Sequence, residues 1–93
     1  VNGNDQKSAK ILKIVIPEDL NFQDAFKDIF DENFTSYELE RVKTINLGTL
    51  FELTYTINEK NGIDEKKFID SIRERNGNLN ITLSKLAPES DRL

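Results

Sequence analysis

The sequence predicts one α+β domain, in which strands and helices follow one another in the order β-α-β-β-α-β. Three observations predict this class. Apolar and polar side chains alternate from Phe51 to Ile57, as they do in a strand with one buried face. Residues 22–33 and the segment between Asp64 and Asn76 repeat apolar side chains at helical spacing. With 93 residues, the chain is long enough for one hydrophobic core and too short for two.

The first strand is predicted over Lys10–Pro17, and Pro17 ends it because proline cannot donate to the strand ladder. Apolar side chains occur on nearly both faces of this segment. That pattern is typical of a strand in the centre of its sheet. One face would carry Leu12, Ile14 and Ile16, and the other Ile11, Lys13 and Val15.

A helix is predicted over residues 22–33, with Asn21 as its N-cap and Asp24 favourable in its first turn. The opposite side of this helix carries acids that could attract a divalent cation or a basic partner. A straight helix face does not converge on an ion, so we interpret the acidic ridge as solvent-exposed surface. The apolar stripe consists of Phe22, Ala25, Phe26, Ile29, Phe30 and Asn33, and the acidic ridge of Asp24, Asp28, Asp31 and Glu32.

Residues 37–57 predict a β-hairpin. Its turn lies at Asn46-Leu47-Gly48, with the glycine in the left-handed position after a type I turn. In the first arm, Leu39 and Val42 cannot lie on one face under strict alternation. Either a bulge near Glu40 realigns them, or one of the two points to the outer face.

A second helix is expected to begin after its cap Asp64, and Ile63 and Phe68 are spaced for a hydrophobic staple across that cap. Gly77 suits the left-handed position that ends the helix. A last strand follows directly. Its alternating apolar side chains are Leu79, Ile81 and Leu83.

With right-handed crossovers, this order gives a four-stranded antiparallel sheet with both helices on one face, the ferredoxin-like plait. We expect the domain to occupy residues 10–86, after a flexible tether at 1–9 and before a tail at 87–93. Since the chain lacks Met and begins with a polar segment, we also expect a fragment of a longer protein. The predicted core consists of Leu12, Ile14, Ile16, Phe26, Ile29, Phe30, Leu39, Phe51, Leu53, Tyr55, Phe68, Ile72, Ile81 and Leu83.

The composition argues against catalysis, and we expect neither an enzyme nor a bound cofactor or metal. The chain has no Cys and no His, which removes disulfides, thiolate zinc sites, cysteine nucleophiles and the side chain that titrates nearest neutral pH. No glycine-rich phosphate loop and no serine nucleophile motif occurs. The net charge of −4 disfavours nucleic acid and anionic lipid as partners. No apolar run approaches the ~20 residues that a membrane span needs.

The face of the sheet opposite the helices is the candidate interface. Ile11 and Val15 would point there, because the alternation places their neighbours in the core. An exposed apolar strip on a sheet is typical of a site where another sheet or domain docks. Scattered surface aliphatic side chains are the alternative. The candidate interface consists of Ile11, Lys13, Val15, Val42, Thr54 and Thr82.

Three segments, residues 44–55, 64–70 and 75–81, resemble a known family. It is the C-terminal soluble tail of a bacterial integral-membrane protein family of unknown function, and the similarity covers residues 10–83. The resemblance implies a domain on the cytoplasmic side of the inner membrane, attached to a membrane protein. It transfers no catalytic residue. The function it implies is self-association or docking to another domain of the parent protein.

A broader similarity is to plait-shaped regulatory domains that sense small molecules or cations. Such domains usually carry glycine in the loop after their first strand. Here that loop is Pro17–Asn21, which has two acids and no glycine. This departure argues against amino-acid sensing. A small-molecule or cation-sensing regulatory domain is the alternative to a docking domain.

Overall fold

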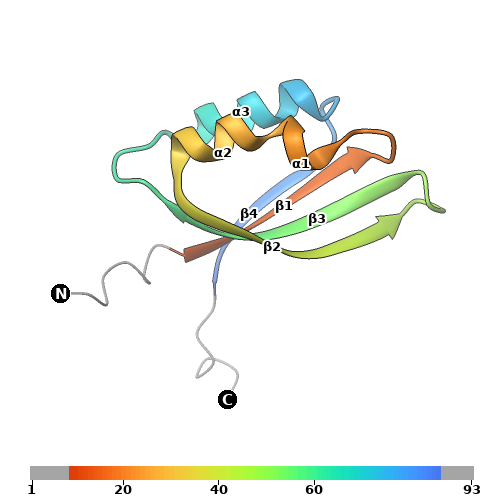
Figure 1. The fold of residues 1–93 in the computed structure, drawn as a ribbon, viewed down its shortest axis with the longest axis horizontal. Helices are drawn as coiled ribbons and strands as arrows, with labels where there is room; N and C mark the ends of the chain where they lie inside the picture. Colours follow the sequence, from red (N-terminus) through yellow and green to blue (C-terminus); the bar gives the residue numbers. More distant parts are fainter. Residues whose placement is uncertain (1–8, 87–93) are drawn as a thin grey trace, which may run out of the picture.

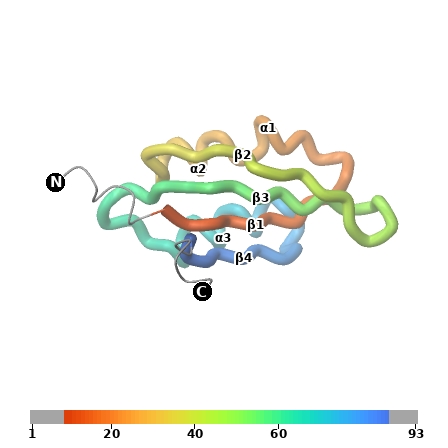
Figure 2. Tube along the Cα trace, turned by 90° about the horizontal axis from the view of Figure 1, so that it is seen from below, coloured from red at the N-terminus to blue at the C-terminus, as the bar shows by residue number. Residues whose placement is uncertain are grey.

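The structure is a computed structural model, and it describes residues 9–86. One four-stranded antiparallel sheet has the strand order β2-β3-β1-β4. The helices lie together against one face of this sheet (Figure 1), and the view from below shows the other face uncovered within residues 9–86 (Figure 2). The elements are β1 (Ala9–Pro17), α1 (Phe22–Ala25), α2 (Lys27–Asn33), β2 (Phe34–Ile45), β3 (Leu50–Glu59), α3 (Glu65–Arg75) and β4 (Ile81–Lys85).

The predicted α+β class and the antiparallel four-stranded sheet are confirmed. The first strand is central, as its two apolar faces indicated, because β1 pairs with β3 on one side and with β4 on the other. Ala9 belongs to β1 and not to the predicted tether. The rest of that tether and the predicted tail at 87–93 lie outside the described residues.

The helix predicted over residues 22–33 is two helices. The chain leaves the helical conformation at Phe26, where φ is −117° and ψ is 5°. Phe26 is fully buried, and its ring stacks on Phe30 with 5.9 Å between centroids. The apolar spacing continues across the break, and neither Gly nor Pro occurs there. The sequence around Phe26 therefore does not predict the break. The predicted N-cap is confirmed, since the Asn21 side chain accepts a hydrogen bond from the backbone N–H of Gln23.

The hairpin turn differs from the predicted type I turn. Asn46 and Leu47 both have positive φ, 54° and 57°, and Gly48 follows at 86°. Positive φ at both central residues is the sign of the mirror-image turn, whose twist matches that of paired strands. The left-handed position of Gly48 is as predicted. Leu47 is fully exposed at the tip of the hairpin.

A β-bulge settles how the first arm of the hairpin faces. Leu39 lies opposite Tyr55 and Arg41 opposite Thr54, which leaves Glu40 as an extra residue. Beyond the bulge, Val42 lies opposite the buried Leu53, so its side chain is on the helix side of the sheet. The prediction that placed Val42 on the open face is therefore wrong.

The observed core agrees with most of the predicted one. Leu39 is the clear exception, with 38% of its surface exposed, because it lies in an edge strand that the helices do not fully cover. Phe34 and Ile57 are buried but were not predicted. The buried cluster consists of Leu12, Ile14, Ile16, Phe26, Ile29, Phe30, Phe34, Leu53, Tyr55, Ile57, Phe68 and Ile72, while Phe51, Ile81 and Leu83 are partly buried against it.

The end of α3 is tied to the sheet by a buried asparagine. Asn76 is fully buried, and its Nδ2 donates to the backbone oxygen of Val15 at 2.8 Å and of Leu79 at 3.2 Å. Gly77 follows with φ of 75°, and the N–H of Asn78 donates to the carbonyl oxygen of Arg73, as in a Schellman motif. The sequence predicted the glycine stop but not the role of Asn76 in joining α3 to β1.

Replacing Asn76 with Ala should lower the free energy of unfolding by about 1–3 kcal/mol, because two buried carbonyl groups lose their donor. Urea titration followed by circular dichroism measures this change. Asn61→Ala is the matched control, since Asn61 is exposed in the turn before α3. It should change the stability by no more than about 0.5 kcal/mol. Equal effects of the two substitutions would contradict the assigned role of Asn76.

Candidate interaction surface

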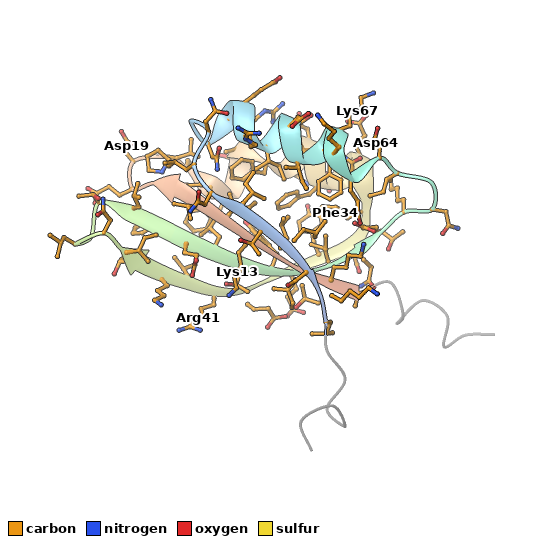
Figure 3. All side chains as sticks on the ribbon, turned by 180° about the vertical axis from the view of Figure 1, so that it is seen from behind. Lys13, Asp19, Phe34, Arg41, Asp64 and Lys67 are labelled. Atoms are coloured by element: carbon orange, nitrogen blue, oxygen red, sulfur yellow. The ribbon has the colours of Figure 1, made fainter. Side chains whose placement is uncertain are left out.

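The open face of the sheet brings together three of the predicted interface residues. Lys13 lies opposite Thr54 of β3 and opposite Thr82 of β4, so the three form one row across the sheet. In Figure 3, Lys13 and Arg41 point away from the helices, whereas Phe34 points toward them. Ile11 lies in the next row and is half-buried. This face is therefore mostly polar in the region that was predicted to dock.

Val15 was expected to form the apolar strip with Ile11, but it is only 8% exposed. Its N–H donates to the backbone oxygen of Asn80 at 3.0 Å, and its carbonyl accepts from Asn76. Its register partner Glu52 is itself half-buried. The chain that leaves α3 thus runs directly beside Val15, and the predicted strip loses one of its two aliphatic side chains.

The more exposed apolar surface lies along β2. This strand is the longest of the sheet and lies at its edge, with β3 on one side and no pairing strand on the other within residues 9–86. Leu39 is 38% exposed and Val42 is 45% exposed. The bulge at Glu40 places both side chains on the same face. Two large exposed apolar side chains thus stand next to each other on a free strand edge.

A groove of about 290 Å³ adjoins these side chains, between β2 and the first two helices. Leu39 lines this groove and Val42 follows it on the same face of β2. We call Leu39, Val42 and the groove the β2 edge surface. The groove is lined by Phe22, Gln23, Phe26, Lys27, Phe30, Tyr37, Leu39 and Tyr55.

Two tyrosines give this groove polar groups that stay uncharged at neutral pH. The Tyr37 hydroxyl donates to Asp31 Oδ1 at 2.8 Å, and this hydrogen bond raises the pKa of Tyr37 and lowers that of Asp31. Burial raises the pKa of Tyr55 to about 12. Lys27 contributes the positive charge at the groove, and its Nζ lies 3.1 Å from Asp31 Oδ2.

The acidic ridge of the first helical segment is exposed, as predicted, and two of its acids also join elements. Asp28 forms a bidentate pair with Arg75 of α3, with 3.0 Å between Nη2 and Oδ2. The hydrogen bond from Arg75 lowers the pKa of Asp28. Asp31 joins α2 to β2 through Tyr37. Two of the four acids of the ridge, Asp28 and Asp31, are therefore paired with cations and hold neighbouring elements together.

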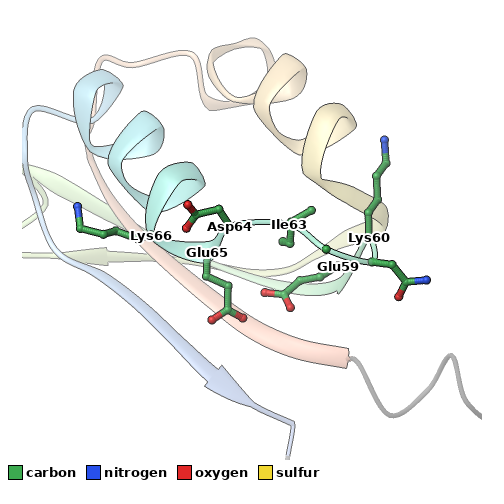
Figure 4. A pocket seen from close by; sticks show the side chains of 8 residues that line it. Glu59, Lys60, Ile63, Asp64, Glu65 and Lys66 are labelled. Atoms are coloured by element: carbon green, nitrogen blue, oxygen red, sulfur yellow. The ribbon is translucent and has the colours of Figure 1, made fainter.

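A larger hollow of about 650 Å³ lies beside the loop that enters α3, and residues 59–66 line it (Figure 4). Figure 4 shows the carboxylates of Glu59 and Glu65 on the same side of this loop. Lys10 Nζ lies 3.3 Å from Glu59 Oε1 and also donates to Glu65. Burial, followed by the neighbouring Glu65, raises the pKa of Glu59. The hydrogen bonds from Glu59 and Lys10 lower the pKa of Glu65.

This hollow is less suited to a ligand than the β2 edge surface. The single stretch of residues 59–66 lines it, and Lys10 already forms ion pairs with Glu59 and Glu65. Within residues 9–86, no group of three or more acidic, His or Cys side chains could hold a metal ion. The same part of the chain contains no helix that is long and apolar enough to cross a membrane.

Replacing Tyr55 with Phe should make the protein less sensitive to alkali. A phenol whose pKa rises from 10.0 to about 12 on folding stabilises the protein fully below pH ~10, and this contribution is lost as the pH rises through the folded value. Urea midpoints at about pH 8 and about pH 11 measure the loss in each protein. The loss of stability should be smaller in Tyr55→Phe, because Phe has no ionisable group. All other residues are the same in both proteins. An equal loss would mean that Tyr55 ionises freely in the folded protein.

The chain was compared with models of protein families, with curated proteins and with solved structures. No family model, no curated protein and no solved structure matches it. Within residues 9–86, the most distinctive surface is the β2 edge surface.

Proposed function

We propose that this chain is a non-catalytic interaction domain, and that it docks a second copy or another protein at the β2 edge surface. The observation that carries the proposal is the exposure of Leu39 and Val42, which lie side by side and next to an aromatic groove, on a strand edge that no strand of residues 9–86 covers. An unpaired edge offers backbone donors and acceptors to an extended segment. A neighbouring pocket can accept one of its side chains.

The open face of the sheet is the weaker docking surface. Of its predicted apolar pair, Val15 is buried and only Ile11 remains accessible. Lys13, Thr54 and Thr82 are polar side chains of a kind that is commonly exposed on a protein surface without a partner. The β2 edge surface leaves more apolar area in contact with water, and burying that area favours association.

The non-catalytic part of the proposal is supported by the chemistry of the groove. A general base near neutral pH would require His, a carboxylate or a lysine with a suitably shifted pKa. The groove instead carries two phenols with raised pKa values and one lysine paired with Asp31. Such a lining can hold an apolar side chain, but it offers no proton acceptor matched to neutral pH.

The strand order β2-β3-β1-β4 supports our further proposal that the fold is a ferredoxin-like plait, with the helices on the crossovers β1 to β2 and β3 to β4. The resemblance in residues 44–55, 64–70 and 75–81 supports a place on the cytoplasmic side of a bacterial inner-membrane protein. In that setting, another domain of the parent protein is a candidate partner. Tethering would raise its effective concentration at β2.

Extended peptides selected from a random phage-display library should bind at the β2 edge surface. We expect the bound peptide to shift the amide NMR signals of residues 37–44 and of the groove. The variant L39D/V42D should weaken binding by about tenfold or more, because it places charge on the apolar contact.

Leu47→Asp is the matched control, since Leu47 is an equally apolar and fully exposed side chain outside the β2 edge surface. It should leave the affinity unchanged. Peptides that instead shift the amide NMR signals of Ile11, Thr54 and Thr82 would overturn docking at β2 and favour the open face.

A small-molecule sensing domain is the second candidate function, and the groove of about 290 Å³ is the observation that favours it. An apolar aromatic compound that binds only the folded protein should raise its melting temperature. The rise should disappear in Leu39→Asp, which charges the lining of the groove. A fragment screen in which no compound stabilises the wild-type protein would argue against sensing through this groove.

A further inference from the structure

We infer that the partner of the β2 edge surface is a second copy of this chain, paired antiparallel so that Leu39 lies opposite Val42 of the other copy. This inference rests on the proposed docking at β2. The two β2 strands would run side by side, and the two sheets would join into one. The two-fold axis would pass between Glu40 and Arg41, as expected of a symmetric dimer in which both copies use the same surface.

The charges along β2 are self-complementary about this axis. Glu38 and Glu40 precede it, and Arg41 and Lys43 follow it, all of them exposed. In the antiparallel pairing, Glu40 lies opposite Arg41 of the other copy, and Glu38 opposite Lys43. Each of these pairs occurs twice in the dimer. Opposite charges directly across two strands favour their pairing, and like charges oppose it.

The bulge is what makes this register compatible with the faces of the strand. Directly opposed residues of two antiparallel strands must lie on the same face of the sheet. In a regular strand, Leu39 and Val42 would point to opposite faces, because three positions separate them. The extra residue Glu40 brings both to the helix side and leaves Arg41 and Lys43 on the open side. The pairs Leu39–Val42 and Glu38–Lys43 then each meet on one face.

Neighbouring registers lose these matches. Moving the axis onto Glu40 would place Glu40 against its own copy and Leu39 against Arg41. Moving it onto Arg41 would place Arg41 against its own copy and Leu39 against Lys43. The sequence of β2 therefore favours one register over its neighbours, which is how paired strands avoid slipping.

A solvated edge that only prevented aggregation would not need this arrangement. Strand edges are commonly protected by charged side chains and bulges, and charges of one sign, such as several lysines, serve that purpose well. On β2, the two signs are instead separated into halves, with an apolar side chain between the acids and another between the bases. That order repels a second copy in the neighbouring registers and attracts it in one.

Charge reversal with rescue tests the inference on the full chain. Sedimentation equilibrium should show a wild-type mass that rises with concentration, and the association should weaken as salt is added because exposed charges are screened. E38K/E40K makes the edge wholly basic, and R41E/K43E makes it wholly acidic. Each variant alone should bind itself at least about tenfold more weakly. An equimolar mixture of the two should associate again, because every opposed pair then has opposite signs.

E18K/E32K is the matched control, because it changes the net charge as E38K/E40K does but at exposed sites outside β2. It should associate like the wild type. The rescue in the mixture also shows that the two reversed variants are folded, as does an unchanged circular dichroism spectrum.

Cysteine cross-linking tests the register itself, since the chain contains no cysteine. A mixture of Leu39→Cys and Val42→Cys proteins should form a mixed disulfide under mild oxidation, because these positions face each other. Leu39→Cys alone should not, because Leu39 and Val42 lie opposite Tyr55 and Leu53, two residues apart on β3. Two copies of position 39 would then be displaced by about 7 Å along the strands, and with about 5 Å between the strands their Cα atoms would be about 8 Å apart. A disulfide requires the two Cα atoms to approach within about 7 Å.

If the wild-type chain stays monomeric at all concentrations, the inference that the partner is a second copy of this chain is wrong. If selected peptides still bind β2 in that case, docking at β2 stands and only this inference fails. If they do not, both fail. Association that survives both charge reversals, or cross-linking of Leu39→Cys alone, would overturn the proposed register.

Discussion

The packing of Phe30 determines how the helices sit on the sheet. Its ring has the rings of Phe26, Phe34, Tyr37 and Tyr55 as neighbours, with centroids between 4.9 and 5.9 Å away. These partners come from the helix break, the start of β2 and the middle of β3. The contacts with Tyr37 and Tyr55 are edge-to-face, a geometry that fixes mutual orientation as well as distance. One side chain of α2 thus joins two strands to the helical layer.

The same packing explains why a surface is left open beside it. The aromatic contacts of Phe30 reach β2 only as far as Tyr37, which Asp31 also holds by a hydrogen bond. β2 continues for eight residues beyond Tyr37, to Ile45, and α1 is too short to cover that part. Leu39 and Val42 fall in this stretch. The exposed apolar edge is therefore a direct result of a long strand beneath a short helix.

Much of the fold could be predicted from the sequence because it depends on local chemistry. The alternation from Phe51 to Ile57, the caps at Asn21 and Asp64, and the glycine stop at Gly77 each have one simple structural solution. The break at Phe26 could not be predicted, because the apolar spacing continues across it and neither Gly nor Pro occurs there.

The candidate surface was harder to predict for a related reason. Strict alternation left two solutions for Leu39 and Val42, and only pairing with β3 selects the bulge at Glu40. Val15 is buried, and its backbone is hydrogen-bonded to Asn76 and Asn80, which are far from it in sequence. The alternation of apolar and polar residues along a strand does not predict hydrogen bonds between segments that are distant in sequence. The self-complementary charges of β2, in contrast, can be read from the sequence once the bulge is known.

The central position of β1 has a consequence for the order in which the protein folds. Among the strands of residues 9–86, β1 leaves the ribosome first, but its ladder partners are made only later, Leu50–Asn58 after β2 and Ile81–Lys85 after α3. The β2–β3 hairpin can close locally once β3 is made, whereas β1 must wait for contacts that are distant in sequence, and such contacts form slowly. Until that moment Lys10–Pro17 is an unpaired segment with apolar side chains on both faces. A nascent chain that stalls before β3 would thus present an aggregation-prone strand, which gives molecular chaperones a defined segment to shield.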